Sequence, residues 1–425
     1  MSRGITGTIR PMPHETDRLR NIHIIFCFLL SALALSNIQA QNGRFGGMQN
    51  MTGRMRGMGG MGQGKADSLQ HRTGKEDSIN IKFRYLDSSR FQFFDSSIKD
   101  FTLRFPIQWN AITLGNFGNA VENRFFSPIY QSGWDPGFHA YDAYQFNTSS
   151  TRFYNTNKPY TEMGYMIGSG SEQMIDLLHT QNIKPNWNAA FQYRLINSPG
   201  VFQNQNTNHN NYRFTSWYQS KRKRYQNFLV IIGNKLQSAE NGGILNDGNY
   251  IDSSVFGNNR LAIPTQLGGS SLASRNFFST SINSGSFYTT ANYLFRQQYD
   301  VGQKDSLVVN DSLTIPLFYP RLRFEHSMSY NTYHYRFKDK TPDSNYYKSY
   351  YGWPEPFTEA AIFNRDLWKE WLNDFSLYTF PDAKNPEQFL KLGASFQQLN
   401  LFTDTFTVSS PYQNFWVHGE YRNKT

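Results

Sequence analysis

The sequence predicts an all-β chain, an antiparallel transmembrane β-barrel of the outer-membrane type that is truncated at its C-terminus. Three observations lead to this prediction: an N-terminal export signal, an unusual composition, and segments in which apolar and polar residues alternate. Only 38% of the 425 residues are hydrophobic, yet 16% are aromatic. A barrel in a bilayer reconciles these values, because each strand turns one face to lipid and one to water, with aromatic girdles at both interfaces.

The first forty residues, 1–40, are predicted to be a signal peptide. Arg18 and Arg20 precede an apolar run over 22–35, and Ala40 supplies a small residue for cleavage. The run is shorter than the roughly 20 apolar residues of a transmembrane helix, so an uncleaved anchor is the weaker reading, as is lipid attachment at Cys27. Because Cys27 is the only cysteine, the mature chain would contain no disulfide, thiolate metal site or cysteine nucleophile.

Three further regions follow the signal peptide. Residues 41–78 are rich in Gly and Met and are predicted to be a flexible periplasmic segment. Their methionines could also bind Cu(I), but a linker explains them more simply. Residues 79–108 are predicted to be a periplasmic lead-in, and residues 109–425 an incomplete β-barrel. The chain ends directly after a predicted strand, so we expect further strands to be needed for closure.

Period-two alternation is the main signal for strands. In 189–195, for example, Ala189, Phe191 and Tyr193 share one face while Gln192 and Arg194 share the other. The same pattern recurs at 287–296, 390–397 and 414–421. The predicted strands are 109–117, 124–130, 160–167, 172–181, 187–195, 211–220, 225–234, 276–284, 287–298, 321–337, 373–380, 388–399 and 413–421.

The predicted connections alternate in length through the middle of the chain. Residues 184–186, 221–224 and 284–286 are short turns, whereas 196–210, 235–275 and 299–320 are long. Outer-membrane barrels have short periplasmic turns and long external loops. The alternation fails at 338–372, where a short turn is due and 358–372 has helical character.

Several blocks together resemble a known family. They include Leu-Gly-Asn-Phe-Gly at 114–118, Thr-Arg-Phe-Tyr-Asn-Thr at 151–156, Gly-Ser-Gly-Ser-Glu-Gln at 168–173 and His-Thr-Gln-Asn-Ile at 179–183. In this combination the chain resembles the putative porin family of Bacteroidetes over roughly 75–425. The resemblance implies an outer-membrane barrel with a transport role, and it brings no catalytic residues.

The sequence contains no motif that indicates an enzyme, a cofactor or a metal site. The nine histidines lack metal-ligand spacing, and nothing in the sequence pairs His179 or His418 with a nucleophile. The net charge of +10 is scattered along the chain, so nucleic acid is not a predicted partner. The basic run 221–224 is predicted to be a turn, and the tyrosines of 346–351 are predicted to pack in a loop rather than bind a sugar.

The predicted function is an outer-membrane, porin-like channel for passive diffusion of small hydrophilic solutes, with outer-membrane lipid around it. The alternatives are a non-channel barrel that binds at the surface or serves an export assembly, and a soluble secreted β-protein. Filling of the lumen by the N-terminal segment or by 338–372 would favour the non-channel barrel. The pore-lining candidates are the polar residues of alternating strands, whose basic members would weakly favour anions: Gln192, Arg194, Arg296, Lys391 and Gln397.

Overall fold

The structure is a computed structural model that describes residues 80–88, 90–94, 104–126, 128, 133–245, 250, 259–268, 282–310, 313–352, 362–403 and 411–423. The chain divides into two units, Met1–Arg72 and Thr73–Thr425, and every described residue belongs to the second. The predicted signal peptide and Gly/Met-rich segment lie outside the described residues.

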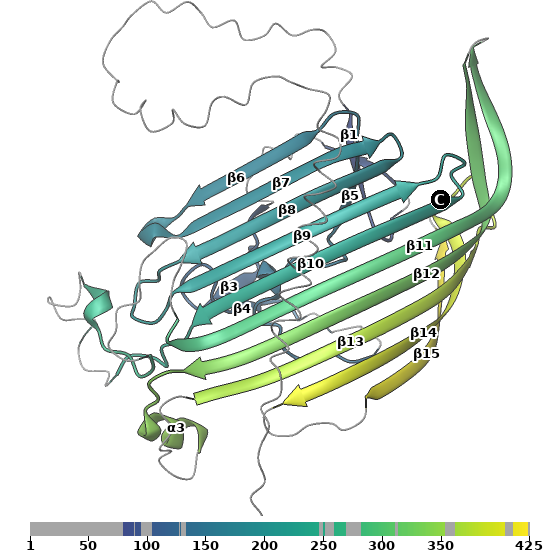
Figure 1. The fold of residues 1–425 in the computed structure, drawn as a ribbon. Coiled ribbons are helices and arrows are strands. Elements are labelled where there is room, and N and C mark those ends of the chain that lie inside the picture. The colour runs from purple at the N-terminus through teal and green to yellow at the C-terminus, as the bar shows by residue number, and fades with distance from the viewer. Residues whose placement is uncertain are drawn as a thin grey trace, which may run out of the picture. The chain divides into compact units, whose positions relative to one another are not determined.

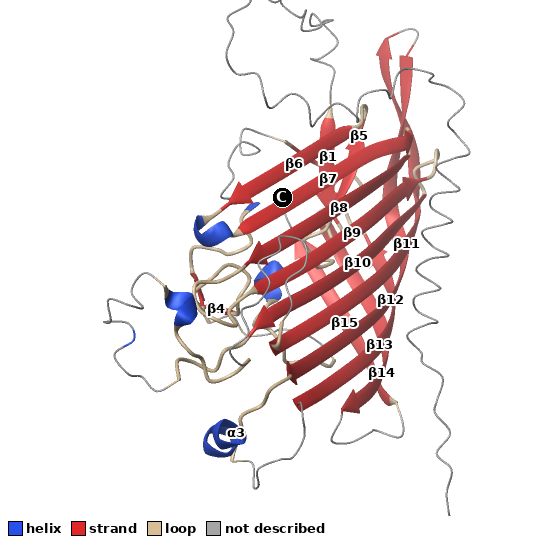
Figure 2. Cartoon of the chain, turned by 60° about the vertical axis from the view of Figure 1, so that its left-hand side comes forward, coloured by secondary structure: helices blue, strands red, loops and turns tan. Residues whose placement is uncertain are grey.

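Ten antiparallel strands form the main sheet, and each pairs with its neighbours in the sequence (Figure 1). Figure 2 shows them side by side in a curved sheet. Within the described residues β6 and β15 are its two edges, and the sheet does not close. The strands are β6 Tyr160–Ile167, β7 Gln173–Lys184, β8 Trp187–Ser198, β9 Thr207–Gln219, β10 Tyr225–Ala239, β11 Ser284–Asn310, β12 Leu313–Asp339, β13 Ile362–Thr379, β14 Gln388–Thr403 and β15 Tyr412–Asn423.

The chain is therefore all-β, as predicted, and the connections between strands differ in length at the two ends of the sheet. At one end the connections are short over 185–186, 220–224 and 311–312 and longer over 380–387. At the other end they are 168–172, 199–206, 240–283, 340–361 and 404–411. The alternation that the sequence indicates thus holds from β7 to β13 and not between β13 and β15.

Two predicted loops are strands in the structure. Residues 284–286, predicted to be a turn, begin β11, and most of 299–320, predicted to be a long loop, belongs to β11 and β12. These two strands pair from Ser284↔Asp339 to Asn310↔Leu313. The predicted strand at 276–284 lies mostly outside the described residues, and its last residue, Ser284, opens β11.

The helical prediction for 358–372 is wrong for its described part, because 362–372 belongs to β13 and pairs with β12 throughout. A short helix instead precedes that strand, α3 at Ser344–Tyr351. The side chain of Asp343 accepts hydrogen bonds from the first backbone amides of α3, and Gly352 ends it at φ 66°. In the described part of the chain no helix is long and apolar enough to cross a bilayer.

Smaller elements precede the main sheet. β1 (Ile81–Tyr85) lies between β2 (Gln92–Phe93) and β5 (Arg152–Thr156) in a three-stranded sheet. β3 (Ala111–Thr113) and β4 (Val121–Asn123) form a separate hairpin; β3 lies within the predicted strand 109–117, whereas β4 ends before the predicted strand 124–130, whose residues 124–126 are not in a strand. The main sheet thus begins at β6. Three short 3₁₀ turns complete the described elements, η4 Asp142–Tyr144, η5 Ser169–Ser171 and η7 Arg260–Ala262.

Candidate functional site on the inner face of the sheet

The two faces of the main sheet differ in chemistry. We call the face that contacts residues 80–156 the inner face and the opposite one the outer face. On the outer face Leu392, Phe415 and Val417 are 56%, 69% and 71% exposed. On the inner face Ser395 and Gln397 are buried. On β14 and β15 alternation thus places apolar side chains outward and polar ones inward, whereas the inner face of β9 and β10 also carries large apolar side chains.

All five pore-lining candidates lie on the inner face, and two of them meet at Asp176 of β7. Arg194 donates from Nε to Asp176 Oδ2 at 2.8 Å, and Gln192 donates from Nε2 to Oδ1 at 2.8 Å. The Arg194 guanidinium also lies over the ring of Phe146, 4.8 Å from its centroid. Asp176 and Arg194 are register partners in adjacent strands, so this cross-strand ion pair was available from the sequence once the register was known.

Arg296 and Lys391 meet at Glu325 of β12, which is buried on the inner face. The Arg296 Nε and the Lys391 Nζ lie 3.9 Å and 4.0 Å from Glu325 Oε1. Gln298 and the Tyr378 hydroxyl donate hydrogen bonds to the same carboxylate at 2.6 Å and 3.1 Å. This many donors stabilise the ionised carboxylate against the cost of burial.

The fifth candidate, Gln397, belongs to a third polar group. Its amide donates to Glu370 and accepts from Asn414 Nδ2 at 2.9 Å. Asn331 Nδ2 donates to the second oxygen of Glu370 at 2.8 Å. The five candidates therefore form three separate groups, each organised by a carboxylate that the sequence prediction did not name.

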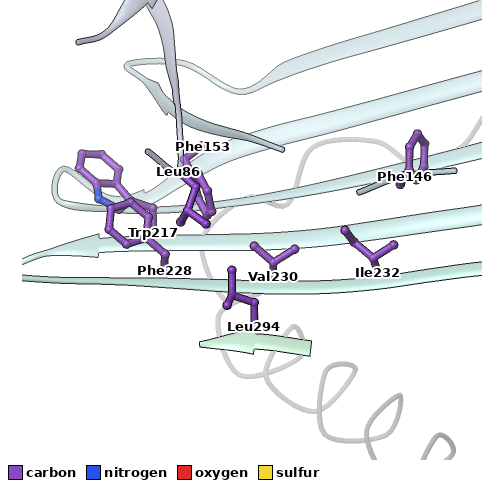
Figure 3. Packing of buried hydrophobic residues seen from close by; sticks show 8 residues of the cluster. All are labelled: Leu86, Phe146, Phe153, Trp217, Phe228, Val230, Ile232 and Leu294. Atoms are coloured by element: carbon purple, nitrogen blue, oxygen red, sulfur yellow. The ribbon is translucent and has the colours of Figure 1, made fainter. Parts of the chain in front are cut away.

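The N-terminal part of the described chain packs on the inner face. Phe146 and Phe153 join a buried cluster with Trp217, Phe228 and Ile232 of β9 and β10 (Figure 3). A second cluster joins the rings of the same N-terminal part to β7, β8, β10 and β11, with these buried members: Phe117, Tyr141, Tyr144, Met174, Ile196, Leu236 and Tyr288.

Hydrogen bonds fix the backbone of the N-terminal part to the sheet. Asn234 of β10 accepts from the Phe146 amide at 2.9 Å and donates to the Phe146 carbonyl at 3.0 Å. His209 Nε2 lies 2.7 Å from the Gly118 carbonyl. Gly118 has φ of +94°, and a Cβ there would meet the Thr207 hydroxyl, so the close approach requires glycine.

Two cavities remain between the N-terminal part and the inner face. The first, which we call the β1 cavity, has a volume of about 310 Å³ and is lined by Arg84 of β1 together with Arg296, Glu325 and Lys391. The second, the central cavity, measures about 710 Å³ and is lined by His139, Asn331, Glu370 and His418 among others. Neither Gln192 nor Arg194 lines either of these two cavities.

A small charged group lies at the edge of the central cavity. His139 contacts Asp135 Oδ1 through Nε2 at 2.8 Å and Asp142 Oδ2 through Nδ1 at 2.9 Å. Partial burial disfavours the imidazolium, but its hydrogen bonds to both carboxylates outweigh this effect and raise the pKa of His139 above its ordinary value. Burial raises the pKa of Asp142 as well.

His418 has a partner that the sequence did not predict. Its Nε2 lies 2.5 Å from Asp374 Oδ2, and the hydroxyls of Ser376 and Ser395 each donate to the same carboxylate at 2.6 Å. Both serine hydroxyls thus donate to the carboxylate of Asp374 and not to the imidazole of His418. In an activated nucleophile the hydroxyl would instead be hydrogen-bonded to its base. His179 lies elsewhere, 2.7 Å from the Thr161 hydroxyl.

Other sequence expectations concern the surroundings of the site. The tyrosines of α3 pack on one another, with Tyr346 and Tyr350 at 4.7 Å and Tyr347 and Tyr351 at 5.7 Å between ring centroids. Among the described residues no group of three His, Cys, Asp or Glu side chains is arranged to hold a metal ion.

Comparison with protein families identifies a match over most of the chain. The model of a protein family described as "Putative porin" matches residues 77–425. That span includes the N-terminal part, the whole main sheet and all five pore-lining candidates. No curated protein matches the chain.

Proposed function

Since the chain belongs to the putative porin family, we propose that it is an outer-membrane channel through which small hydrophilic solutes diffuse passively. The observation that carries the proposal is the chemical difference between the faces of the ten-stranded sheet. On β14 and β15 apolar side chains face outward and polar ones inward, and paired polar side chains also face inward on β7, β8 and β12. Transmembrane barrels have this arrangement because lipid surrounds them and water fills them.

The outer face supports a location in the outer membrane with lipid as the first partner. Its exposed residues include Met163 on β6, Trp371 and Phe375 on β13, and Tyr421 on β15. In water, a contiguous surface of this kind would be expected to drive aggregation or association. Export would depend on the proposed signal peptide at 1–40, and N-terminal sequencing of the mature protein should then begin at Gln41.

The polar groups suggest how solutes would be discriminated. Arg194, Arg296 and Lys391 each lie within 4.0 Å of a carboxylate. A cation paired with a carboxylate contributes less positive electrostatic potential to the lumen than an unpaired cation does. The weak anion preference expected from basic residues alone is therefore reduced at these positions, and solute size would matter more.

Conductance in planar lipid bilayers tests the proposal. The purified full chain should produce discrete current steps that scale with salt concentration, and liposomes containing it should admit small neutral sugars. A protein that folds in detergent but carries no current and admits no sugar would contradict passive diffusion.

The packing of residues 104–156 on the inner face favours a second candidate, a barrel that is not an open channel and serves binding or assembly at the surface. Tyr144, Phe146 and Phe153 are all buried against the sheet, so they occupy space that solutes would need. The two candidates differ in what happens when this packing is loosened. An obstructed channel should gain conductance, whereas a non-channel barrel should not.

A further inference from the structure

Arg84 is a buried cation in the β1 cavity that the fold does not match with an acid. Its side chain lies on β1, only 8% of the residue is exposed, and it lines the cavity. The Arg84 Nε has no hydrogen-bond partner, and no carboxylate of the described residues forms an ion pair with the guanidinium. Buried arginines normally have both kinds of partner, since an unmatched buried charge is costly.

Aromatic rings compensate only part of that cost. The Arg84 guanidinium lies 4.7 Å from the ring centroid of Phe228 and 5.7 Å from that of Trp217. Contacts of this type are weaker than an ion pair that is supported by hydrogen bonds. Burial, followed by the nearby charge of Arg323, lowers the pKa of Arg84 to about 9. Arg84 therefore stays charged near neutrality, and the carboxylates of Asp300 and Glu325 attract it from a distance without forming an ion pair.

The other cations that line the cavity form ion pairs, either with carboxylates of the cavity wall or with Asp300 outside it. Four further cations line it, Arg296, Arg323, Lys391 and Arg422, beside the carboxylates of Asp87, Glu325 and Glu420. Arg296 donates to Asp87 at 2.6 Å, and Arg422 donates to Glu420 at 2.8 Å. Arg323 binds Asp300, which does not line the cavity, through two nitrogens at 2.7 and 2.9 Å.

The remaining wall of the β1 cavity is aromatic. Tyr378, Phe380 and Phe389 form a buried cluster in which the rings of Tyr378 and Phe389 lie 5.3 Å apart. All three line the cavity together with Leu86. The volume of about 310 Å³ is at the lower end of the range for small-molecule sites, so one ring with a short charged substituent would fit.

We propose that the β1 cavity binds a small solute in which a carboxylate or phosphate is attached to an aromatic or apolar ring. The anion pairs with Arg84 and gains further attraction from Arg296 and Lys391, while the ring rests against Tyr378 and Phe389. The inference rests on the proposed channel function, because it assigns one solute class to the inner face.

Isothermal titration of the purified full chain in a zwitterionic detergent tests the site without requiring conductance. The probes are benzoate and phenyl phosphate, with benzyl alcohol and benzylamine as neutral and cationic counterparts of similar size. One anion should bind per chain, and both counterparts should bind at least tenfold more weakly. Tighter binding of benzoate assigns a carboxylate to the natural ligand, and tighter binding of phenyl phosphate assigns a phosphate.

Two arginine variants separate the site from general effects of charge. Arg84→Gln should weaken anion binding by about 10- to 100-fold, the value of a charge-assisted hydrogen bond. Arg213→Gln is the matched control, because Arg213 stacks on Phe146 at the same 4.7 Å but does not line the cavity. Equal binding by Arg84→Gln and the native chain would overturn the proposal, as would equal affinity for benzyl alcohol.

Folding and function are checked separately. Heat-modifiable migration on a detergent gel reports whether each variant folds. If Arg84→Gln does not fold, Lys391→Gln takes its place, since Lys391 lines the cavity from β14. Conductance without anion binding would leave the channel proposal standing and remove the site. Anion binding without conductance would keep the site and remove passive diffusion.

Discussion

The ring of Phe138 lies flat on the ring of Tyr335, with centroids 4.1 Å apart and an angle of 15° between the planes. Phe138 belongs to the N-terminal part, and Tyr335 belongs to β12 of the main sheet. The ring of Trp368 on β13 also packs against Phe138, with 5.4 Å between the ring centroids. Segments about two hundred residues apart in the sequence are thus joined directly at the inner face.

Replacing Phe138 should loosen the N-terminal part. Phe138→Ala removes the stacked pair and should cost about 2 kcal/mol, below the value for a fully buried phenylalanine because Phe138 is half-buried. Limited proteolysis should cut 104–156 faster, and bilayer conductance should rise. Phe375→Ala is the control, since Phe375 stacks on His326 at 4.3 Å on the outer face. Equal proteolysis of both variants would contradict this role.

Asn234 should hold the backbone of Phe146 in place. Asn234→Ala leaves the buried amide and carbonyl of Phe146 without these partners, at a cost of about 1–3 kcal/mol. Hydrogen exchange at the Phe146 amide should accelerate by at least tenfold. Asn292→Ala is the control, because Asn292 bonds to Asn331 in the next strand. Unchanged exchange in Asn234→Ala would show that ring packing alone holds this segment.

The His139 group should make the N-terminal part more stable at acidic pH. The pKa of His139 is raised in the folded state, so its stabilisation is full below about 6.5, the unfolded value, and is lost as pH rises through the folded value. Protection factors for hydrogen exchange across 134–145, which correct for the base-catalysed intrinsic rate, should therefore be larger at pH 6 than at pH 8.

The histidine variant makes that pH dependence specific. His139→Gln should remove the difference in protection factor between pH 6 and pH 8, whereas His179→Gln, which changes the outer face, should keep it. A difference that persists in His139→Gln would assign the pH dependence to another group.

Glu325 should have opposite effects on stability and on anion binding. Glu325→Gln keeps one acceptor oxygen for Gln298 or Tyr378, leaves Lys391 without its ion pair and leaves Arg296 with Asp87 alone, which should cost about 3 kcal/mol. The same change should tighten benzoate binding in the β1 cavity severalfold. Glu420→Gln, at an exposed pair, should cost about 1 kcal/mol or less. Weaker benzoate binding by Glu325→Gln would contradict the assigned role of the cations.

The strands that the sequence predicts well are those with one apolar and one polar face. β8 and β15 alternate cleanly, and the predicted 187–195 and 413–421 lie within them. The choice of inward face follows from the same alternation, which is why Gln192, Arg194, Arg296, Lys391 and Gln397 all lie on one side.

Failures occurred where apolar residues do not follow period two. In β13, Leu367, Trp368, Trp371 and Leu372 recur as pairs four residues apart, which fits one face of a helix. In the strand Trp368 is buried on the inner face and Trp371 is exposed on the outer face. Both faces of this strand carry large side chains, so pairing with β12 outweighs the local periodicity.

Long-range pairing explains the remaining misses. The polar residues of 299–306 suggest a loop, yet they lie in β11 because the partner strand β12 extends equally far. The partners of the pore-lining candidates, Asp176, Glu325 and Glu370, become evident only when strand register is known. The packing of 104–156 on the inner face has no local sequence signal, since it depends on contacts such as Phe138 with Tyr335.

The division between a lipid-facing and a water-facing side of the sheet is the central claim. The most direct measurement places nitroxide labels singly along β15 from 414 to 421, in Cys27→Ser chains reconstituted in lipid, and compares collisions with oxygen and with a water-soluble nickel chelate. We predict oxygen preference at Phe415, Val417 and Tyr421 and chelate preference at Asn414, Trp416 and His418. Equal access of the chelate to both sets would contradict the account.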